Sequence, residues 1–316
     1  MRGNLLVMGV VMGLVLCLPM PGLAATKAQI EEASAGMQDA EPANRIKAAA
    51  LLGSYNDRRC APVLVEALKK DEDAGVRAEA AKGLPGTRER TAVPPLMDAL
   101  VGDADAGVRA ACAKALGLYK DPRIVEALAK AITDDEDETV RLEAIRAVAV
   151  FQDARSIDPL LAALQDAVAA NRREAITLLG GINDPAVLEP LRNALKDEDP
   201  ENRQAAAKAL EGRQGAGADA ASVEELTAAL QDADPATRRQ ALLALTRIQG
   251  ADALAILLAA MADEDASVRA AAAAGLKGLD ADAVNPALLT ATKDADAAVR
   301  REAVSALLAR GSAEIG

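Results

Sequence analysis

Residues 71–84 read DEDAGVRAEAAKGL, and this stretch recurs along the chain with few changes. Two close copies are DADAGVRAACAKAL at residues 103–116 and DEDASVRAAAAAGL at residues 263–276. With the weaker copies included, the leading aspartate occurs at positions 39, 71, 103, 135, 166, 197, 232, 263 and 294. These starts are 31 or 32 residues apart, except for one interval of 35. A fixed period of this length indicates an array of repeats, each stacked on its neighbours.

Each copy predicts an acidic turn followed by a helix. Aspartate side chains accept hydrogen bonds from the unpaired N–H groups at a helix start, and their charge suits its positive end. Val76, Ala80, Ala81 and Leu84 then follow at helical spacing and form one apolar stripe. A second apolar helix is predicted before each copy, as in VPPLMDAL at residues 93–100. The repeat is therefore a first helix, an acidic turn and a second helix.

A short glycine loop closes the repeat, as in LGSYND at residues 52–57, LGLYKD at 116–121 and LGGIND at 179–184. We expect the glycine to adopt the left-handed conformation that ends a helix. The polar run EGRQGAGADAAS at residues 211–222 accounts for the interval of 35 residues and predicts a flexible point within the array.

The recurring pattern D-x-D-x-x-V-R-x-x-A-x-x-A-L resembles the HEAT repeat family, most closely its short bacterial branch of phycobilisome-lyase type. The resemblance covers residues 26–316. It implies an all-α, right-handed α-solenoid of about nine stacked two-helix repeats. Such solenoids serve many unrelated roles, so the resemblance by itself implies no single activity.

The composition narrows the classes of function. The chain has no histidine, which excludes His-based catalytic triads and the usual His-ligated zinc or iron sites. Iron-binding HEAT-like hydroxylases use His–Glu pairs that this chain lacks. The net charge of −12 and only three aromatic residues argue against nucleic-acid binding. We therefore expect no cofactor and no metal.

Residues 1–25 have the pattern of a secretory signal peptide. An apolar run at residues 5–18 follows Arg2, and small residues end the segment, so cleavage is expected after Ala24 or Ala25. The run is shorter than the roughly 20 residues of a membrane span. Lipidation at Cys17 is the alternative, although Leu16 before it is not small. The prediction is a bacterial periplasmic or secreted protein with no stable membrane anchor after cleavage.

One arginine lies six residues after each leading aspartate. These arginines are Arg45, Arg77, Arg109, Arg141, Arg172, Arg203, Arg238, Arg269 and Arg300. A binding surface is one interpretation, but we favour a structural ladder in which each arginine bonds the acidic turn of a neighbouring repeat. The D-x-D turns also resemble calcium loops. The twelfth position from Asp71 is Lys82, however, where such a loop needs glutamate.

A less regular row is the better candidate for a binding site. The second helices carry Lys82, Lys114, Arg146 and Lys208 at one register position, on the side expected to be concave. We predict that this row binds a protein or peptide partner. Pairing with glutamates three residues earlier, as in Glu79–Lys82, is an equally good explanation.

Two functional hypotheses remain. The first is a non-enzymatic scaffold or adaptor that binds protein or peptide partners on the concave face. The second is a lyase-type enzyme of the HEAT-like family, or a protein accessory to one. Cys60 and Cys112 are expected to be buried thiols, with a disulfide as the alternative.

Overall fold

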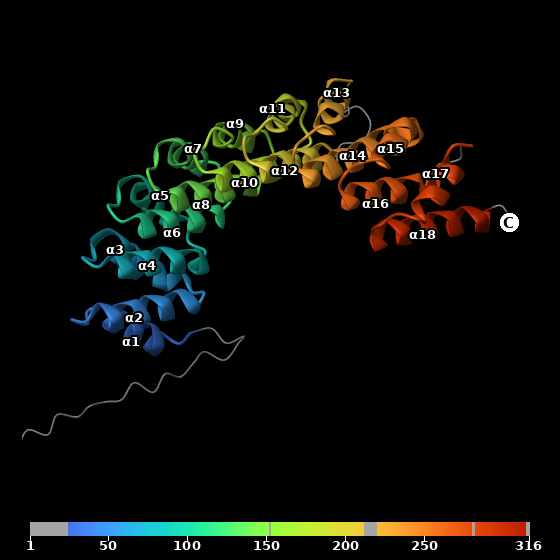
Figure 1. The fold of residues 1–316 in the computed structure, drawn as a ribbon. Helices are drawn as coiled ribbons and strands as arrows, with labels where there is room; N and C mark the ends of the chain where they lie inside the picture. The colour runs from blue at the N-terminus through green and yellow to red at the C-terminus, as the bar shows by residue number, and fades with distance from the viewer. Residues whose placement is uncertain (1–24, 152, 212–219, 280–281, 314–316) are drawn as a thin grey trace, which may run out of the picture. The chain divides into compact units, whose positions relative to one another are not determined.

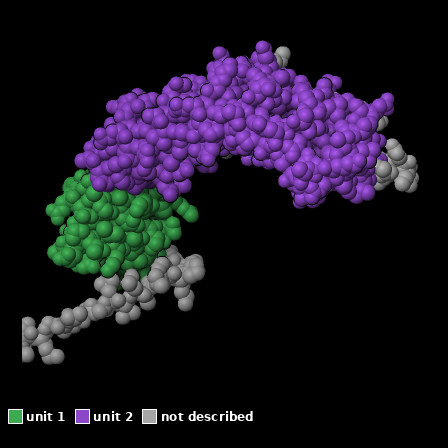
Figure 2. All heavy atoms as spheres, viewed as in Figure 1, with its two compact units in different colours: residues 1–92 green, residues 93–316 purple. Residues whose placement is uncertain are grey.

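The structure is a computed structural model that describes residues 25–151, 153–211, 220–279 and 282–313. These residues form eighteen α-helices and no strand (Figure 1). The chain divides into two compact units, Met1–Ala92 and Val93–Gly316, called unit 1 and unit 2 here (Figure 2). The predicted signal peptide, up to residue 24, and residues 212–219 of the predicted flexible loop lie outside the described residues.

Helices alternate between the two positions of the predicted repeat. The first helices are α1 (Lys27–Gly36), α3 (Ala61–Lys70), α5 (Val93–Gly102), α7 (Ile124–Asp134), α9 (Ala154–Ala163), α11 (Leu188–Ala194), α13 (Ala220–Ala229), α15 (Leu254–Ala260) and α17 (Val284–Ala291). The second helices are α2 (Pro42–Ser54), α4 (Ala74–Thr87), α6 (Ala106–Gly117), α8 (Glu138–Val148), α10 (Ala169–Gly180), α12 (Pro200–Glu211), α14 (Pro235–Gln249), α16 (Ala266–Gly275) and α18 (Ala297–Ala313). Helices α1 to α4 belong to unit 1, and the remainder belong to unit 2. The prediction of an all-α solenoid of helix pairs is confirmed.

The apolar stripe of the second helix forms the core, as predicted. Val76, Ala80, Ala81 and Leu84 all have 0% exposed surface. Such a helix cannot bury its stripe within its own repeat, so burial requires a stacked neighbour.

The two aspartates of each D-x-D turn have different roles. In the second repeat, Asp73 caps α4, because its Oδ1 accepts the N–H of Val76 at 3.0 Å. Asp105 and Asp137 cap α6 and α8 in the same way. The leading aspartate does not cap the helix. Asp71 Oδ1 instead accepts the N–H of Asp73 at 3.0 Å, which holds the turn and leaves the carboxylate pointing toward the neighbouring repeat.

The expected role of the loop glycines is wrong. The described residues with positive φ outside glycine are Asn56, Arg88 and Lys120, at 52°, 61° and 50°. Gly117 and Gly180 lie inside helices, where each allows a close approach between second helices. A Cβ at Gly117 would lie 3.0 Å from Ala147 Cα, and one at Gly180 would lie 2.8 Å from Ala209 Cβ. Glycine therefore serves packing at these positions and not chain reversal.

Close packing of small residues gives unit 2 its own curvature. The second helices contact one another more extensively than the first helices do. Alanine and glycine at these contacts bring helix axes together, while the bulkier first helices stay further apart. The second helices accordingly form the inner layer of unit 2 (Figure 1), whose curvature is visible in Figure 2.

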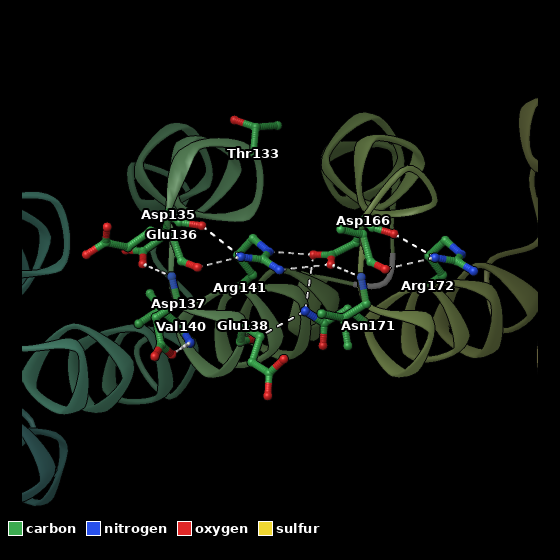
Figure 3. A network of polar contacts seen from close by, with 12 residues as sticks. Thr133, Asp135, Glu136, Asp137, Glu138, Val140, Arg141, Asp166, Asn171 and Arg172 are labelled. Carbon is green, nitrogen blue, oxygen red and sulfur yellow. Dashed lines mark hydrogen bonds and ion pairs between the residues drawn. The ribbon is translucent and has the colours of Figure 1, made fainter.

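An arginine–aspartate ladder joins successive repeats. In Figure 3, Arg141 Nε and Nη2 donate to the two carboxylate oxygens of Asp166 in the next repeat, at 2.7 and 3.0 Å. Its Nη1 donates to the carbonyls of Asp135 and Glu136 in its own turn. Equivalent forked pairs are Arg45–Asp71, Arg109–Asp135, Arg172–Asp197, Arg203–Asp232, Arg238–Asp263 and Arg269–Asp294.

The ladder is largely shielded from water. Its aspartate side chains are between 1% exposed, at Asp166, and 15% exposed, at Asp294. The hydrogen bond from Arg238 lowers the pKa of the Asp263 carboxyl against the opposing effect of burial. The hydrogen bond from Arg269, aided by the N–H of Asp296, lowers the pKa of Asp294. These carboxylates are therefore charged in the folded protein at any pH above about 4.

The burial of Leu116 yields a prediction about stability. This side chain lies in the core of α6 with 0% exposure. We expect Leu116→Ala to lower the free energy of unfolding by about 2–5 kcal/mol, because it leaves a cavity between packed helices. Leu118→Ala is the matched control, since Leu118 is 69% exposed and its loss should change stability by less than about 0.5 kcal/mol. Urea denaturation followed by circular dichroism measures both, and equal midpoints would show that Leu116 is not a core residue.

The ladder yields a prediction about pH. Because the folded pKa of Asp263 lies below its ordinary value, its contribution is present above pH ~4 and is lost as the pH falls further. The urea midpoint should therefore drop steeply as the pH falls below about 4. Asp263→Asn should cost about 3 kcal/mol at neutral pH, because the buried Arg238 loses its shielded ladder carboxylate and keeps the exposed Glu264 as its ion-pair partner. That variant should also show a shallower dependence on pH, and an unchanged slope would assign the acid sensitivity to other groups.

Candidate functional site

The predicted binding row lies on the second helices, and its members are exposed. In unit 2, Lys114 is on α6, Arg146 on α8 and Lys208 on α12, each at the same register position. Thr177 occupies this position on α10, between Arg146 and Lys208, and is also exposed. Lys82 occupies it on α4 of unit 1. We call the surface that carries this row in unit 2 the second-helix face.

Two of the four cations already have partners. Lys82 Nζ lies 3.1 Å from Glu79 Oε2. Arg146 lies 3.2 Å from Glu143, one turn earlier on α8, and 3.2 Å from Glu174 on α10. Exposed pairs of this kind contribute roughly 0–1 kcal/mol each, so they leave these cations available to exchange partners.

The other two cations form no ion pair with any described residue. Lys114 and Lys208 are exposed, and no carboxylate of the described chain lies within 4.0 Å of either ammonium group. The sequence has 48 acidic residues against 36 basic ones. Unpaired cations on one face of so acidic a protein are a local departure from its overall charge.

Leu118 adds an apolar element that the sequence analysis missed. It ends α6 one turn after Lys114 and is 69% exposed. Equivalent positions hold Ser54, Gly86 and Gly181, while Val150 in the repeat after Leu118 is half-buried. A comparison of the repeats at this position would have identified the leucine as the largest apolar side chain there. Lys114 and Leu118 together present a cation beside an exposed apolar side chain.

The C-terminal part of the face has no such charge. The row continues as Leu243 on α14, Ala274 on α16 and Ser305 on α18, and Leu243 is half-buried. The cationic part of the second-helix face therefore extends from α6 to α12.

A hollow in unit 2 is lined by residues of α9, α10 and α11 and of the turns that follow α9 and α11. Its volume is about 680 Å³, and its ionisable lining residues are Asp166, Arg172, Lys196, Asp197 and Glu198. Each of them is in an ion pair, either within the ladder or with a neighbouring turn or helix. The hollow thus offers no uncompensated charge to a ligand.

The described residues contain no cluster of three or more residues suited to hold a metal ion. The acidic turns explain this, because their carboxylates bind arginine or cap helices. Cys60 and Cys112 are buried free thiols, and burial raises their pKa values to about 11 and about 12. No described helix is both long enough and apolar enough to span a membrane.

Solved structures share the fold. Kap121p, bound to the extreme C-terminus of the phosphatase Cdc14p, matches with a TM-score of 0.64 at 14% identity, over 92% of this chain and 38% of that one. Kap95p, in a complex with RanGDP, matches with a TM-score of 0.60 at 15% identity, over 89% and 47%. The chain thus spans less than half the length of either protein.

A third structure is the CpcE–CpcF complex of phycocyanin lyase from Nostoc sp. PCC7120. It has 23% identity and covers 79% of this chain and 95% of that one, but the TM-score is only 0.41. A likeness this weak gives no support to the lyase-type hypothesis over the scaffold. No curated protein matches the sequence.

The family model described as HEAT repeats matches residues 30–111, 93–174, 157–222, 215–277 and 257–314. These matches overlap and cover nearly all of the described residues. The chain belongs to the HEAT repeat family.

Proposed function

We propose that this protein is an exported, non-enzymatic scaffold or adaptor that binds a protein or peptide on the second-helix face. The observation that carries the proposal is the exposure of Lys114 and Lys208 without a carboxylate partner among the described residues. On a chain of net charge −12, exposed cations that have no carboxylate partner favour binding to a partner with acidic side chains.

Arg146 lies between these two lysines and can join them in binding. Its Nη1 and Nε already contact Glu143 and Glu174, but a guanidinium has five N–H donors. An incoming carboxylate can use the remaining donors without breaking either contact. The two glutamates also hold the guanidinium in place, which lowers the entropy lost on binding.

Leu118 gives the partner an apolar contact beside Lys114. The two side chains are four residues apart and so lie on one side of α6. A partner segment with an apolar residue next to an acidic one fits this pair. Because the described cationic part of the face, from α6 to α12, has one strongly exposed leucine and no aromatic anchor in its row, we expect modest affinity, on the order of micromolar.

The shared fold supports this use of the inner surface. Kap121p and Kap95p have the same type of helix array and were solved with protein partners. Extended inner surfaces are what α-solenoids present to other molecules. No described residue favours the lyase-type alternative in a comparable way.

The first test is charge reversal of the row. We expect the combined variant Lys82→Glu, Lys114→Glu, Arg146→Glu and Lys208→Glu to lose the partner, because like charges would then face its acidic side chains. The measurement has two steps. Proteins captured from cell-envelope extract by the parent and by the variant are first compared by quantitative mass spectrometry. The affinity of each differential partner is then measured by calorimetry at two salt concentrations.

A matched control reverses four exposed lysines outside the row. Lys69→Glu, Lys130→Glu, Lys277→Glu and Lys293→Glu change the net charge by the same amount without touching the second-helix row. This control should retain the partner. Equal binding by both variants, or equal loss in both, would show that the row is only solvated surface.

The second test concerns export, which rests on the residue pattern of residues 1–25 alone. Expressed in a Gram-negative bacterium, the full chain should appear in the periplasm or medium with its N-terminus at Ala25 or Thr26, as read by mass spectrometry. Leu14→Arg interrupts the apolar run, so this variant should remain in the cytosol as an unprocessed chain. Unprocessed parent protein in the cytosol would contradict the proposal.

A further inference from the structure

Among the described residues, the last second helix, α18, exposes two apolar side chains, and one of them is at a position that the other repeats of unit 2 bury. Val304 is 44% exposed, and Leu308, one turn later, is 69% exposed. The position of Val304 holds a residue no more than 1% exposed in each earlier repeat of unit 2: Ala113, Ile145, Ile176, Ala207, Leu242 and Ala273. The outer repeats of a solenoid usually carry a polar face for solubility, and α18 departs from this rule.

The described ladder also ends on α18, at Arg300. Its Nη1 is hydrogen-bonded, but its Nε and Nη2 have no carboxylate partner among the described residues. Arg300 Nη1 donates to the carbonyls of Asp294 and Ala295, both at 2.7 Å, as the other ladder arginines do in their own turns. The guanidinium is therefore held in the ladder orientation. In Arg269 of the preceding repeat, Nε and Nη2 bind the next leading aspartate, Asp294. No carboxylate of the described residues pairs with these two atoms of Arg300.

The opposite end of the array offers the missing aspartate. Asp39, the first leading aspartate, has the same local hydrogen bond as the others, since its Oδ1 accepts the N–H of Glu41 at 2.8 Å. No arginine fork from the described residues reaches its carboxylate, and Asp39 is exposed. Asp71 in the next repeat has that fork, and its side chain is 10% exposed.

Asn44 on α2 supplies a second complementary group. Its position faces the preceding repeat, and two equivalent residues bond the first carbonyl of the preceding second helix. Asn171 Nδ2 donates to Glu138 O at 3.1 Å, and Thr237 Oγ1 donates to Pro200 O at 3.4 Å. Asn44 is exposed and has no preceding second helix among the described residues.

We propose that the two ends of the array bind each other between copies of this chain. Arg300 of one copy forms the forked ion pair with Asp39 of a second copy, which continues the ladder across the contact. Asn44 of the second copy donates to the carbonyl of Ala297, the first residue of α18. Val304 and Leu308 are then covered by α2.

This contact is heterologous, because each copy contributes a different end. Such contacts generate rings or open chains, according to whether the rotation closes. The groups involved lie outside the cationic part of the second-helix face, which extends from α6 to α12, so the inference is independent of the proposed function. A second copy is the favoured occupant because the two ends of the described array complement each other as two neighbouring repeats do. They match in charge, in hydrogen-bonding groups and in apolar surface.

The test begins with the purified chain, its N-terminus read by mass spectrometry. Sedimentation velocity from about 1 to about 200 µM should show mass that rises with concentration. Arg300→Glu and Asp39→Arg should each weaken self-association at least about tenfold, since each places like charges at the junction. Leu308→Lys should weaken it as well, through the apolar part of the contact.

Mixing the two charge variants provides the decisive experiment. In an equimolar mixture of Arg300→Glu and Asp39→Arg chains, a junction between the two swapped ends pairs opposite charges. Association should therefore return in the mixture while each variant alone stays weak. Circular dichroism melting curves of the separate variants establish that both are folded.

Lys277→Glu is the matched control, because it makes the same charge change at an exposed site of the preceding repeat. It should associate like the parent. A parent that stays monomeric at all concentrations overturns the proposal. So does self-association that survives both charge variants, or a mixture that fails to restore it.

Discussion

The structure depends on one forked, hydrogen-bonded ion pair at each repeat junction within unit 1 and within unit 2. The arginine binds two carbonyls of its own turn and both oxygens of the next leading aspartate. The arginine can make all of these bonds only when its own turn has the right shape and the next turn lies at the right distance. Charge-assisted bidentate pairs combine strength with strict geometry, so the ladder sets the register in which repeats stack.

Small side chains let the repeats pack closely in the register that the ladder sets. A core rich in alanine buries little area per residue, and single junctions are correspondingly weak. Gly117 and Gly180 compensate by allowing second helices to approach until backbone and Cβ atoms are in contact. The same close approach places the second helices on the inner side of unit 2, where the cationic row lies. Stability and the location of the candidate site thus come from one packing rule.

The regularity of the array makes its exceptions informative. Lys114 and Lys208 break the charge balance of the second-helix face, and Leu118 breaks its polarity. Val304 breaks the burial pattern of its register position at the end of α18. In a repeat protein, the other copies serve as internal controls for each position, so an exception that costs solubility or charge balance points to a binding role.

Much of this could be read from the sequence, and the rest was decided by contacts between repeats. The repeat period determined the helix pairs, and the spacing of Val76, Ala80, Ala81 and Leu84 determined which side of the second helix is buried. Local hydrogen bonding is encoded by neighbours in the chain, so the caps of the D-x-D turns followed too. The helix-ending role expected of the glycines failed, because a loop motif does not distinguish a left-handed residue from a contact point.

Only the tertiary structure showed which atoms of Arg141 meet Asp166, that Gly117 lies against Ala147, and that Arg146 is engaged while Lys114 is not. It also showed Val304 exposed, although this residue is at a position of the buried stripe, and Leu308 exposed one turn later. The physical reason is that these properties depend on residues of neighbouring repeats, distant in the chain, which come together only when repeats stack. Periodicity specifies the repeat, whereas contacts between repeats specify which of its groups remain available to a partner.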